Sequence, residues 1–331
     1  MHSTWKVGRA GCVPMAVVAA MLASAATSVA AGAPPAPVGT AGHTVQLVAR
    51  GIGSPTQIAF AHGRVLVAAA GDEQTGKGGG IWQIWHGKVL QLTTTPFFGL
   101  VFTHNTLFAS GHNKVMSSVW ANGGLTPPKV IFQRPTSDLQ YLETMAVGPD
   151  GRLYMGSSDA GEKGAIGTPL SGRVLAIKRD GSGLEQIAKG LRQPFGIAFL
   201  AGDPSPVVGN EGEGKPNPPD FIVHADKGSD FGFPKCQWTS PSASACAGKT
   251  APVVRLRPHA SPTGLVGRGS TIYAAFFGGT TKQGPEIRAY SDQGRVSKQL
   301  VRSALPLIGV GLNGPWLYFG DVGGSIYRVK V

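Results

Sequence analysis

The chain has 331 residues, of which 15% are charged, and its formal net charge is +12 at pH 7. The Lys and Arg residues are spread thinly and form no stripe with interleaved aromatic side chains. This argues against a nucleic-acid partner and favours solubility or adhesion to an anionic envelope. The 49 glycines occur at strand ends and turns throughout, as expected where many tight connections need a positive φ.

The first segment, residues 1–31, is predicted to be a secretory signal peptide. Lys6 and Arg9 precede a run from Val13 to Ala26 that is almost free of polar residues, and small residues follow it where a signal peptidase would cut. The run is short for a bilayer-spanning helix, which needs about 20 residues; a retained anchor is the alternative. We expect a periplasmic or secreted protein with no stable membrane insertion after signal removal, followed by a proline-rich linker over 32–42.

A short sequence motif, called the recurring phrase below, occurs six times along the rest of the chain. Each copy starts at a small or turn residue and continues into an apolar strand start, a polar turn and a second strand. The intervals between equivalent positions are 42, 45, 52, 68 and 45 residues. A repeat of about 40 to 50 residues that consists of short strands is typical of propeller blades rather than of a helical solenoid. The equivalent positions are Ile58, Leu100, Met145, Ile197, Leu265 and Val310.

These repeats predict an all-β fold, a six-bladed β-propeller over residues 43–331. No long segment has a helical period. The strand predicted at 43–48 has no blade of its own, so we expect it to complete the last blade beside the strand at 325–329. Closure by an N-terminal strand leaves only short, protected sheet edges.

The longest interval contains an insertion around 202–258, where function is expected because loops on a rigid scaffold carry most binding residues. The insertion holds Cys236 and Cys246 in a loop rich in Ser, Ala and Pro. An exported chain can oxidise them, and one disulfide would stabilise the fold by roughly 3 kcal/mol in the chain-entropy estimate. A zinc site would need further Cys or His ligands at short spacing, which the sequence lacks.

Common catalytic motifs are weak in this chain. The stretch 71–78 has the spacing of a phosphate-binding loop, but Gly78 stands where magnesium needs Ser or Thr, and a strand follows instead of a helix. The sequence at 156–160 resembles a serine nucleophile site only loosely. The histidines are scattered and form no close pair; His259, at the start of the fifth blade, is the best candidate for a general base.

Five motifs in a fixed order resemble the glucose/sorbosone dehydrogenase family. This family includes soluble pyrroloquinoline-quinone sugar dehydrogenases and pyranose dehydrogenases. The chain resembles a divergent member over about half of its mature length. The matching motifs are GPDGRLY at 148–154, GRVL at 172–175, GLRQPFG at 190–196, PPD at 218–220 leading to DFGFPKC at 230–236, and PHASPTGL at 258–265.

The resemblance implies a quinone over the central channel, held by calcium, an Arg-Asn pair and other basic side chains. Arg192 matches the cofactor-binding arginine, and Gln193 replaces the asparagine after it. Gly212 and Glu213 stand where the family supplies calcium ligands. The implied activity is oxidation of a small-molecule sugar or related carbohydrate by hydride transfer to pyrroloquinoline quinone.

The position of the catalytic base departs from the family pattern. Gln140 occupies the place of the family's catalytic histidine and cannot act as a base near neutral pH. Asp159 matches the carboxylate that would orient that histidine. A base would have to come from His259, Asp159 or a water molecule held by Gln140. The alternatives are a non-catalytic binding or scaffold propeller that has lost the reaction and, third, a calcium-dependent lactonase.

Overall fold

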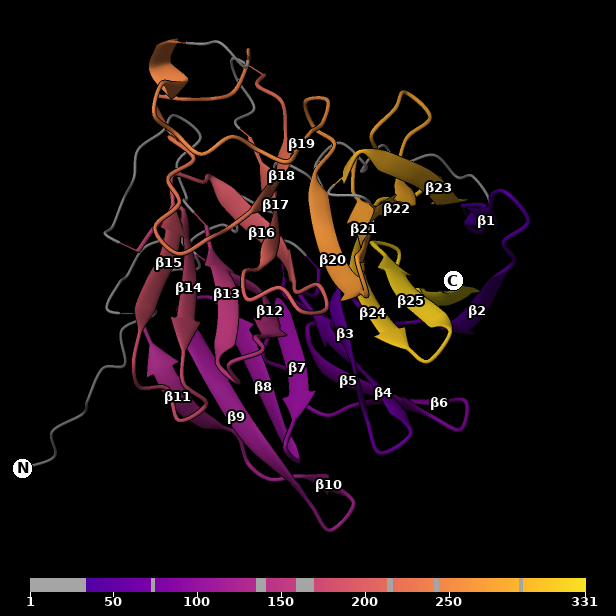
Figure 1. Cartoon of the computed structure of the whole chain (residues 1–331). Helices are drawn as coiled ribbons and strands as arrows, with labels where there is room; N and C mark the ends of the chain where they lie inside the picture. Colours follow the sequence, from indigo (N-terminus) through magenta and orange to yellow (C-terminus); the bar gives the residue numbers. More distant parts are fainter. Residues whose placement is uncertain are drawn as a thin grey trace, which may run out of the picture.

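The computed structural model describes residues 34–72, 75–134, 141–158, 170–212, 217–240, 244–291 and 294–331. Six antiparallel sheets form a ring around a central channel, and each sheet places its first strand nearest the axis (Figure 1). The prediction of an all-β, six-bladed propeller is confirmed. Among the described residues, no helix is both long and apolar enough to cross a membrane.

The first three blades follow the chain from the inside outward. Blade 1 consists of β3 (Pro55–Ala61), β4 (Arg64–Ala69), β5 (Gly80–Trp85) and β6 (Lys88–Gln91). Blade 2 consists of β7 (Gly99–Thr103), β8 (Thr106–Gly111) and β9 (Lys114–Ala121), with β10 (Gly124–Leu125) and β11 (Lys129–Gln133) both pairing with β9. Blade 3 consists of β12 (Leu142–Val147), β13 (Leu153–Ser157), β14 (Arg173–Ile177) and β15 (Glu185–Lys189).

The last three blades repeat this order. Blade 4 consists of β16 (Gln193–Ala198), β17 (Val207–Glu211), β18 (Phe221–His224) and β19 (Val254–Arg255). Blade 5 consists of β20 (Pro262–Arg268), β21 (Thr271–Phe276), β22 (Glu286–Ser291) and β23 (Val296–Arg302). Blade 6 contains β24 (Leu307–Asn313), β25 (Trp316–Asp321) and β26 (Ile326–Lys330).

The N-terminal strand β2 (Val45–Ala49) completes blade 6 by pairing antiparallel with β26, as the sequence predicts. Figure 1 shows the indigo β2 near the yellow end of the chain, so the two ends of the sequence close the ring. A second N-terminal strand was not predicted. β1 (Val38–Gly39) lies in the segment expected to be a linker and pairs with β23 at the outer edge of blade 5.

The recurring phrase forms the first strand of every blade, and its six equivalent apolar residues are all buried. Close approach between neighbouring first strands requires glycine at some of these positions. A Cβ on Gly264 would lie 2.2 Å from the main-chain oxygen of Ile308 in the next blade, well inside van der Waals contact. The buried apolar residues and the glycines of the recurring phrase together let the first strands pack closely around the axis.

Buried hydroxyl groups connect neighbouring first strands. The Oγ1 of Thr56 in blade 1 donates to the main-chain oxygen of Phe97, 3.0 Å away at the start of blade 2. The Oγ1 of Thr263 in blade 5 makes the corresponding bond to Leu307 of blade 6 at 2.9 Å. Thr144 of blade 3 bonds in the same way to a carbonyl of blade 4. These bonds pair buried carbonyl groups with donors from the neighbouring blade.

The segment after β18 contains the predicted disulfide, between Cys236 and Cys246. Cys246 closes a short 3-10 helix, Ser244–Cys246, and both cysteines are buried against the hydrophobic core of blades 3 and 4. The indole nitrogen of Trp238 donates to the main-chain oxygen of Phe231 at 2.9 Å. The described parts of the insertion are thus a packed extension of blade 4.

We expect Thr56→Val to lower the free energy of unfolding by about 1–2 kcal/mol, because the substitution leaves the buried carbonyl of Phe97 without its donor. Thr56→Ser is the matched control, since it keeps the hydroxyl and removes only a methyl group, which costs about 1 kcal/mol or less. Urea denaturation measures both. Equal losses in the two variants would show that the hydroxyl bond contributes nothing.

Candidate functional site

The upper end of the channel is defined here as the end at which the first strand of every blade begins. The loops between second and third strands lie at the same end, because strands within each blade alternate in direction. An apolar cluster joins residues of five blades there, which places it across the axis. The ring centres of Phe98 and Tyr141 are 5.1 Å apart, and those of Phe98 and Phe195 are 6.4 Å apart. The buried members are Ala70, Phe98, Tyr141, Phe195 and Ile308.

The lower part of the channel is a cavity of about 440 Å³ lined by residues from all six first strands. Its walls are the later halves of those strands, including Leu100, Met145 and Ile197. The aromatic cluster therefore caps a hollow channel at its upper end. A planar aromatic ligand at that end would meet an apolar surface.

Gln193 begins β16 beside this cap, Arg192 directly precedes it, and both are buried. The main-chain N–H groups of Arg192 and Gln193 donate to the side-chain oxygen of Asn210 on β17, at 2.9 and 3.1 Å. The Nη1 of Arg192 donates to the main-chain oxygen of Gly212 at 2.8 Å. One amide thus fixes the start of the strand, and the guanidinium holds the loop after β17.

Asp220 is a buried carboxyl that joins this loop to blade 5. Its Oδ1 accepts from the N–H of Gly212 and its Oδ2 from the N–H of Ser261, both at 2.7 Å. Burial raises the pKa of Asp220 to about 6, while the two N–H donors and the charges of His259 and Arg192 oppose the shift. Asp220 acts as a positioning group because both of its oxygens are engaged by the main chain.

Glu143 on β12 is a fully buried carboxyl between blades 3 and 4. Burial raises its pKa to about 8. The polar groups of Ser158 and Gln193 face the carboxyl and oppose the shift, but neither carboxyl oxygen has a hydrogen bond of good geometry. Among the described residues, the Nε of Arg192 is also buried without a hydrogen-bond partner. Such groups cost about 1–3 kcal/mol each when they stay unpaired, so their concentration here indicates a place for a polar ligand or water.

The structure brings together three of the residues predicted from the sequence: Arg192, Gln193 and Gly212. His259 is exposed, adopts a positive φ of 56°, and acts on this group only through its charge on Asp220. Gln140, Asp159 and Glu213 lie outside the described residues.

Sequence reasoning missed Glu143 and gave Asp220 no role. Asp220 lies inside a motif stretch that was matched only for its family resemblance. Glu143 stands within the third copy of the recurring phrase, where other copies carry Phe98, Phe195 and Ile308. The remaining two copies carry Thr56 and Thr263 there, so a carboxyl at a position that otherwise holds an aromatic, aliphatic or hydroxyl side chain is the signal that could have identified it.

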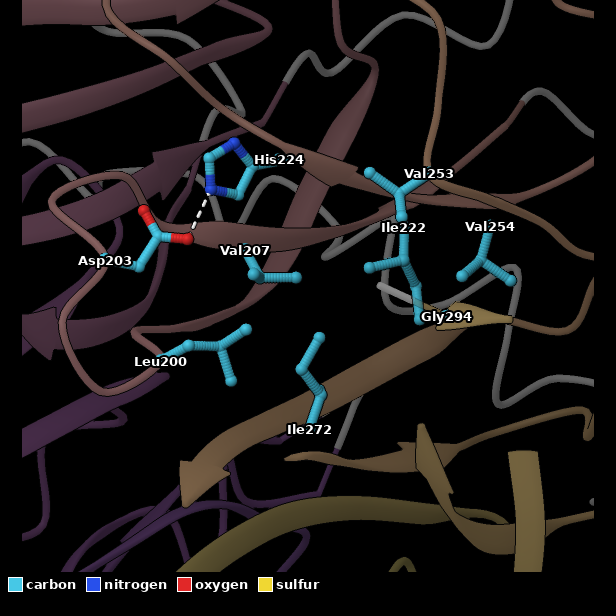
Figure 2. A pocket seen from close by; sticks show the side chains of 9 residues that line it. All are labelled: Leu200, Asp203, Val207, Ile222, His224, Val253, Val254, Ile272 and Gly294. Carbon is cyan, nitrogen blue, oxygen red and sulfur yellow. Dashed lines mark hydrogen bonds and ion pairs between the residues drawn. The ribbon is translucent and has the colours of Figure 1, made fainter. Parts of the chain in front are cut away.

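A separate apolar cleft of about 300 Å³ lies between blades 4 and 5 at the lower end (Figure 2). It is left open because β19, the outer strand of blade 4, has only two residues. At one side His224 contacts Asp203 at 2.6 Å and Asp226 at 3.3 Å. Both imidazole nitrogens are thus already engaged, so we place the candidate site at the upper end.

Several solved structures resemble the whole fold. The PQQ-bound aldose sugar dehydrogenase of Streptomyces coelicolor is 18% identical, with a TM-score of 0.67 covering 90% of this chain and 99% of that chain. A Trichoderma reesei carbohydrate-active enzyme of family AA12 is 16% identical, with a TM-score of 0.75 over 92% and 100%. The PQQ domain of pyranose dehydrogenase from Coprinopsis cinerea, in its holo form, is 13% identical, with a TM-score of 0.71 over 90% and 98%.

No family model and no curated protein matches the sequence. At such identities the likeness to solved structures establishes the fold. It confirms, at the level of the fold, the resemblance to sugar dehydrogenases that the sequence motifs indicate.

We expect the stability difference between wild type and Asp220→Asn to depend on pH with a defined sign. The folded-state pKa of Asp220 lies above the usual value of 3.8, so its contribution is fully present below about pH 4 and is lost as the pH rises through about 6. Wild type should therefore lose stability relative to Asp220→Asn between pH 4 and 7 in thermal denaturation. A difference that is constant over this range would contradict the assignment.

Proposed function

We propose that this chain is an exported sugar dehydrogenase-like protein that transfers hydride from a sugar to pyrroloquinoline quinone. The observation that carries the proposal is the buried pair of Arg192 and Gln193 at the capped end of the channel, where the Nε of Arg192 has no hydrogen-bond partner among the described residues. The names of the similar structures, which include aldose sugar and pyranose dehydrogenases with a PQQ group, support the same choice.

The polar and apolar groups at the upper end fit a quinone of this kind. The planar ring system would rest against the aromatic cap, and Arg192 with Gln193 would donate to its oxygen atoms. When bound, the quinone supplies the hydride acceptor. The guanidinium of Arg192 stabilises negative charge that develops next to it, and burial strengthens this effect because little water screens the charge.

Calcium is proposed at the loop after β17, with Gly212 and Glu213 as ligands. A main-chain carbonyl is a suitable calcium ligand, and the oxygen of Gly212 has a second lone pair besides the one that accepts from Arg192. Asp220 supports this ligand because it holds the N–H of the same glycine at 2.7 Å. The loop conformation that presents the carbonyl is therefore fixed by a buried carboxyl.

A binding or scaffold propeller without catalysis is the second candidate. It is favoured by the aromatic cap, which already covers the upper end of the channel, and by Gln140 in place of a catalytic histidine. A calcium-dependent lactonase would need side-chain carboxylates that converge on a metal. In the part of the chain that the structure describes, no three His, Cys, Asp or Glu side chains are grouped in that way.

Quinone binding and sugar oxidation test the proposal directly. Purified mature protein is mixed with pyrroloquinoline quinone and calcium, and we expect a bound-quinone absorbance and aldose-dependent reduction of a dye. Arg192→Ala should weaken quinone binding at least about tenfold, because a charge-assisted hydrogen bond to a buried group contributes roughly 1.5–3 kcal/mol.

Arg302→Ala is the matched control for charge, since Arg302 is exposed on the outer strand of blade 5. It should bind the quinone as wild type does. If wild type binds no quinone and reduces no dye, the dehydrogenase proposal is wrong. If binding occurs and Arg192→Ala does not weaken it, the placement of the quinone is wrong.

A further inference from the structure

The pairing of first and second strands shows where the side chain of Glu143 belongs in the ring. In blade 3 the register skips from Leu142 to Met145, which leaves Glu143 and Thr144 in a bulge. Blade 4 skips in the same way over Phe195 and Gly196. Blade 6 skips over Ile308 and Gly309. Glu143 therefore takes the bulge position that Phe195 and Ile308 take in these two blades, and the register skips of blades 1 and 5 place Thr56 and Thr263 there.

Phe195 and Ile308 are both members of the axial cap. An apolar side chain at this position packs against other apolar side chains, whereas a carboxyl must give up its hydration to be buried there. The surroundings of Glu143 offset only part of that loss, because Ser158 and Gln193 oppose the shift and burial still raises the pKa of the carboxyl to about 8. The other blades carry Phe, Ile or Thr at this position, and a carboxyl that is kept there at the cost of its hydration indicates a chemical role rather than a structural one.

We propose that Glu143 is the catalytic base of this chain, accepting the proton of the substrate's hydroxyl group at its carboxylate. The inference rests on the proposed function and supplies the base that Gln140 cannot provide. Glu143 faces Gln193, which directly follows Arg192, so the carboxyl lies beside the proposed quinone-binding pair.

The proposed step is balanced in protons and electrons. The O–H bond of the sugar breaks and its proton passes to a carboxylate oxygen of Glu143. The C–O bond becomes a C=O bond, and the hydrogen on the same carbon leaves as hydride with two electrons to the quinone. Glu143 then returns its proton to solvent. Ser158 and the amide of Gln193, which face the carboxyl, favour its charged form.

The charge state of Glu143 is set mainly by burial. Among the described residues, no cation ranks with the causes that act on its pKa, which burial raises to about 8. In the described part of the chain, the titratable groups around it are Tyr141 and His112. The pKa of Tyr141 is raised by burial and by Glu143, and the ring of His112 packs on Tyr141, with a pKa lowered by burial and by Lys114. Arg192 is also close to this group, because it directly precedes Gln193 in the sequence. A base with a pKa near the working pH is well matched to proton abstraction.

The pH profile of turnover provides the activity test, with Glu143→Gln as the variant. In quinone- and calcium-loaded wild type, kcat/KM for an aldose should rise with pH through about 8. Glu143→Gln should lose this alkaline rise and lower kcat by about 10²–10⁴-fold, the usual contribution of a general base. Quinone absorbance should be unchanged, because the variant keeps Arg192 and Gln193.

Glu286→Gln is the matched control, because Glu286 is buried but fully partnered. Its carboxyl contacts Thr280, Arg288 and Gln299, and its pKa is lowered. This variant should keep the alkaline rise of kcat/KM. An unchanged profile in Glu143→Gln would overturn the inference while leaving the dehydrogenase proposal intact. Absence of turnover in wild type would overturn both.

A stability measurement tests the carboxyl without turnover. The folded-state pKa of Glu143 lies above its usual value of 4.5, so its contribution to stability is lost as the pH rises through about 8. The Tm of wild type should fall relative to that of Glu143→Gln by roughly 5 °C between pH 5 and 9. Glu286→Gln should show the opposite sign, with wild type the more stable protein above about pH 5. A pH-independent Tm difference for Glu143→Gln would show that this carboxyl does not titrate as a base must.

Discussion

The hydrogen bonds between neighbouring first strands are the constraint on which the rest of this molecule depends. Each blade is a small sheet that would be marginal on its own, and the ring holds only if the innermost strands stay in register around the axis. Thr56, Thr144 and Thr263 bond to the next blade by their hydroxyl groups. Gln57 extends the same principle, since its side-chain amide bonds to Leu100 in blade 2 and to Met145 in blade 3.

The same bonds position the candidate site. Ser110 of blade 2 donates to the main-chain oxygen of Glu143, and Thr144 donates to that of Phe195. The main chain on both sides of the Glu143 side chain is thereby fixed to the neighbouring blades. Asp220 plays the equivalent part between blades 4 and 5, where it bonds to main-chain N–H groups instead of carbonyls. The scaffold and the site therefore share their interactions, and a variant that loosens the ring will also move the site.

The sequence predicts the scaffold well because the same sequence motif occurs once in every blade. Ile58 and its five equivalents lie in the first strands of the six blades. The extra strand predicted at 43–48 belonged to no repeat, which predicted that it completes the last blade, as β2 does. Arg192, Gln193 and Gly212 could be found because short motifs place them. β1 escaped prediction because two residues in a proline-rich segment carry no period. Glu143 escaped it because the meaning of one carboxyl in the phrase depends on contacts with blade 4, which is more than forty residues away in the sequence.

The two buried carboxyls at the upper end differ because their partners differ. Asp220 receives two main-chain N–H groups and the charges of Arg192 and His259, which oppose burial and keep its pKa near 6. Among the described residues, Ser158 and Gln193 act on Glu143 more weakly than burial does, and its pKa rises to about 8. At neutral pH one carboxyl is therefore mainly ionised and holds the loop, while the other keeps a proton that it can exchange. Environments that separate the pKa values of two nearby carboxyls in this way give one a structural role and the other a chemical role. The division follows from the surroundings of each carboxyl and requires no histidine at the centre of the channel.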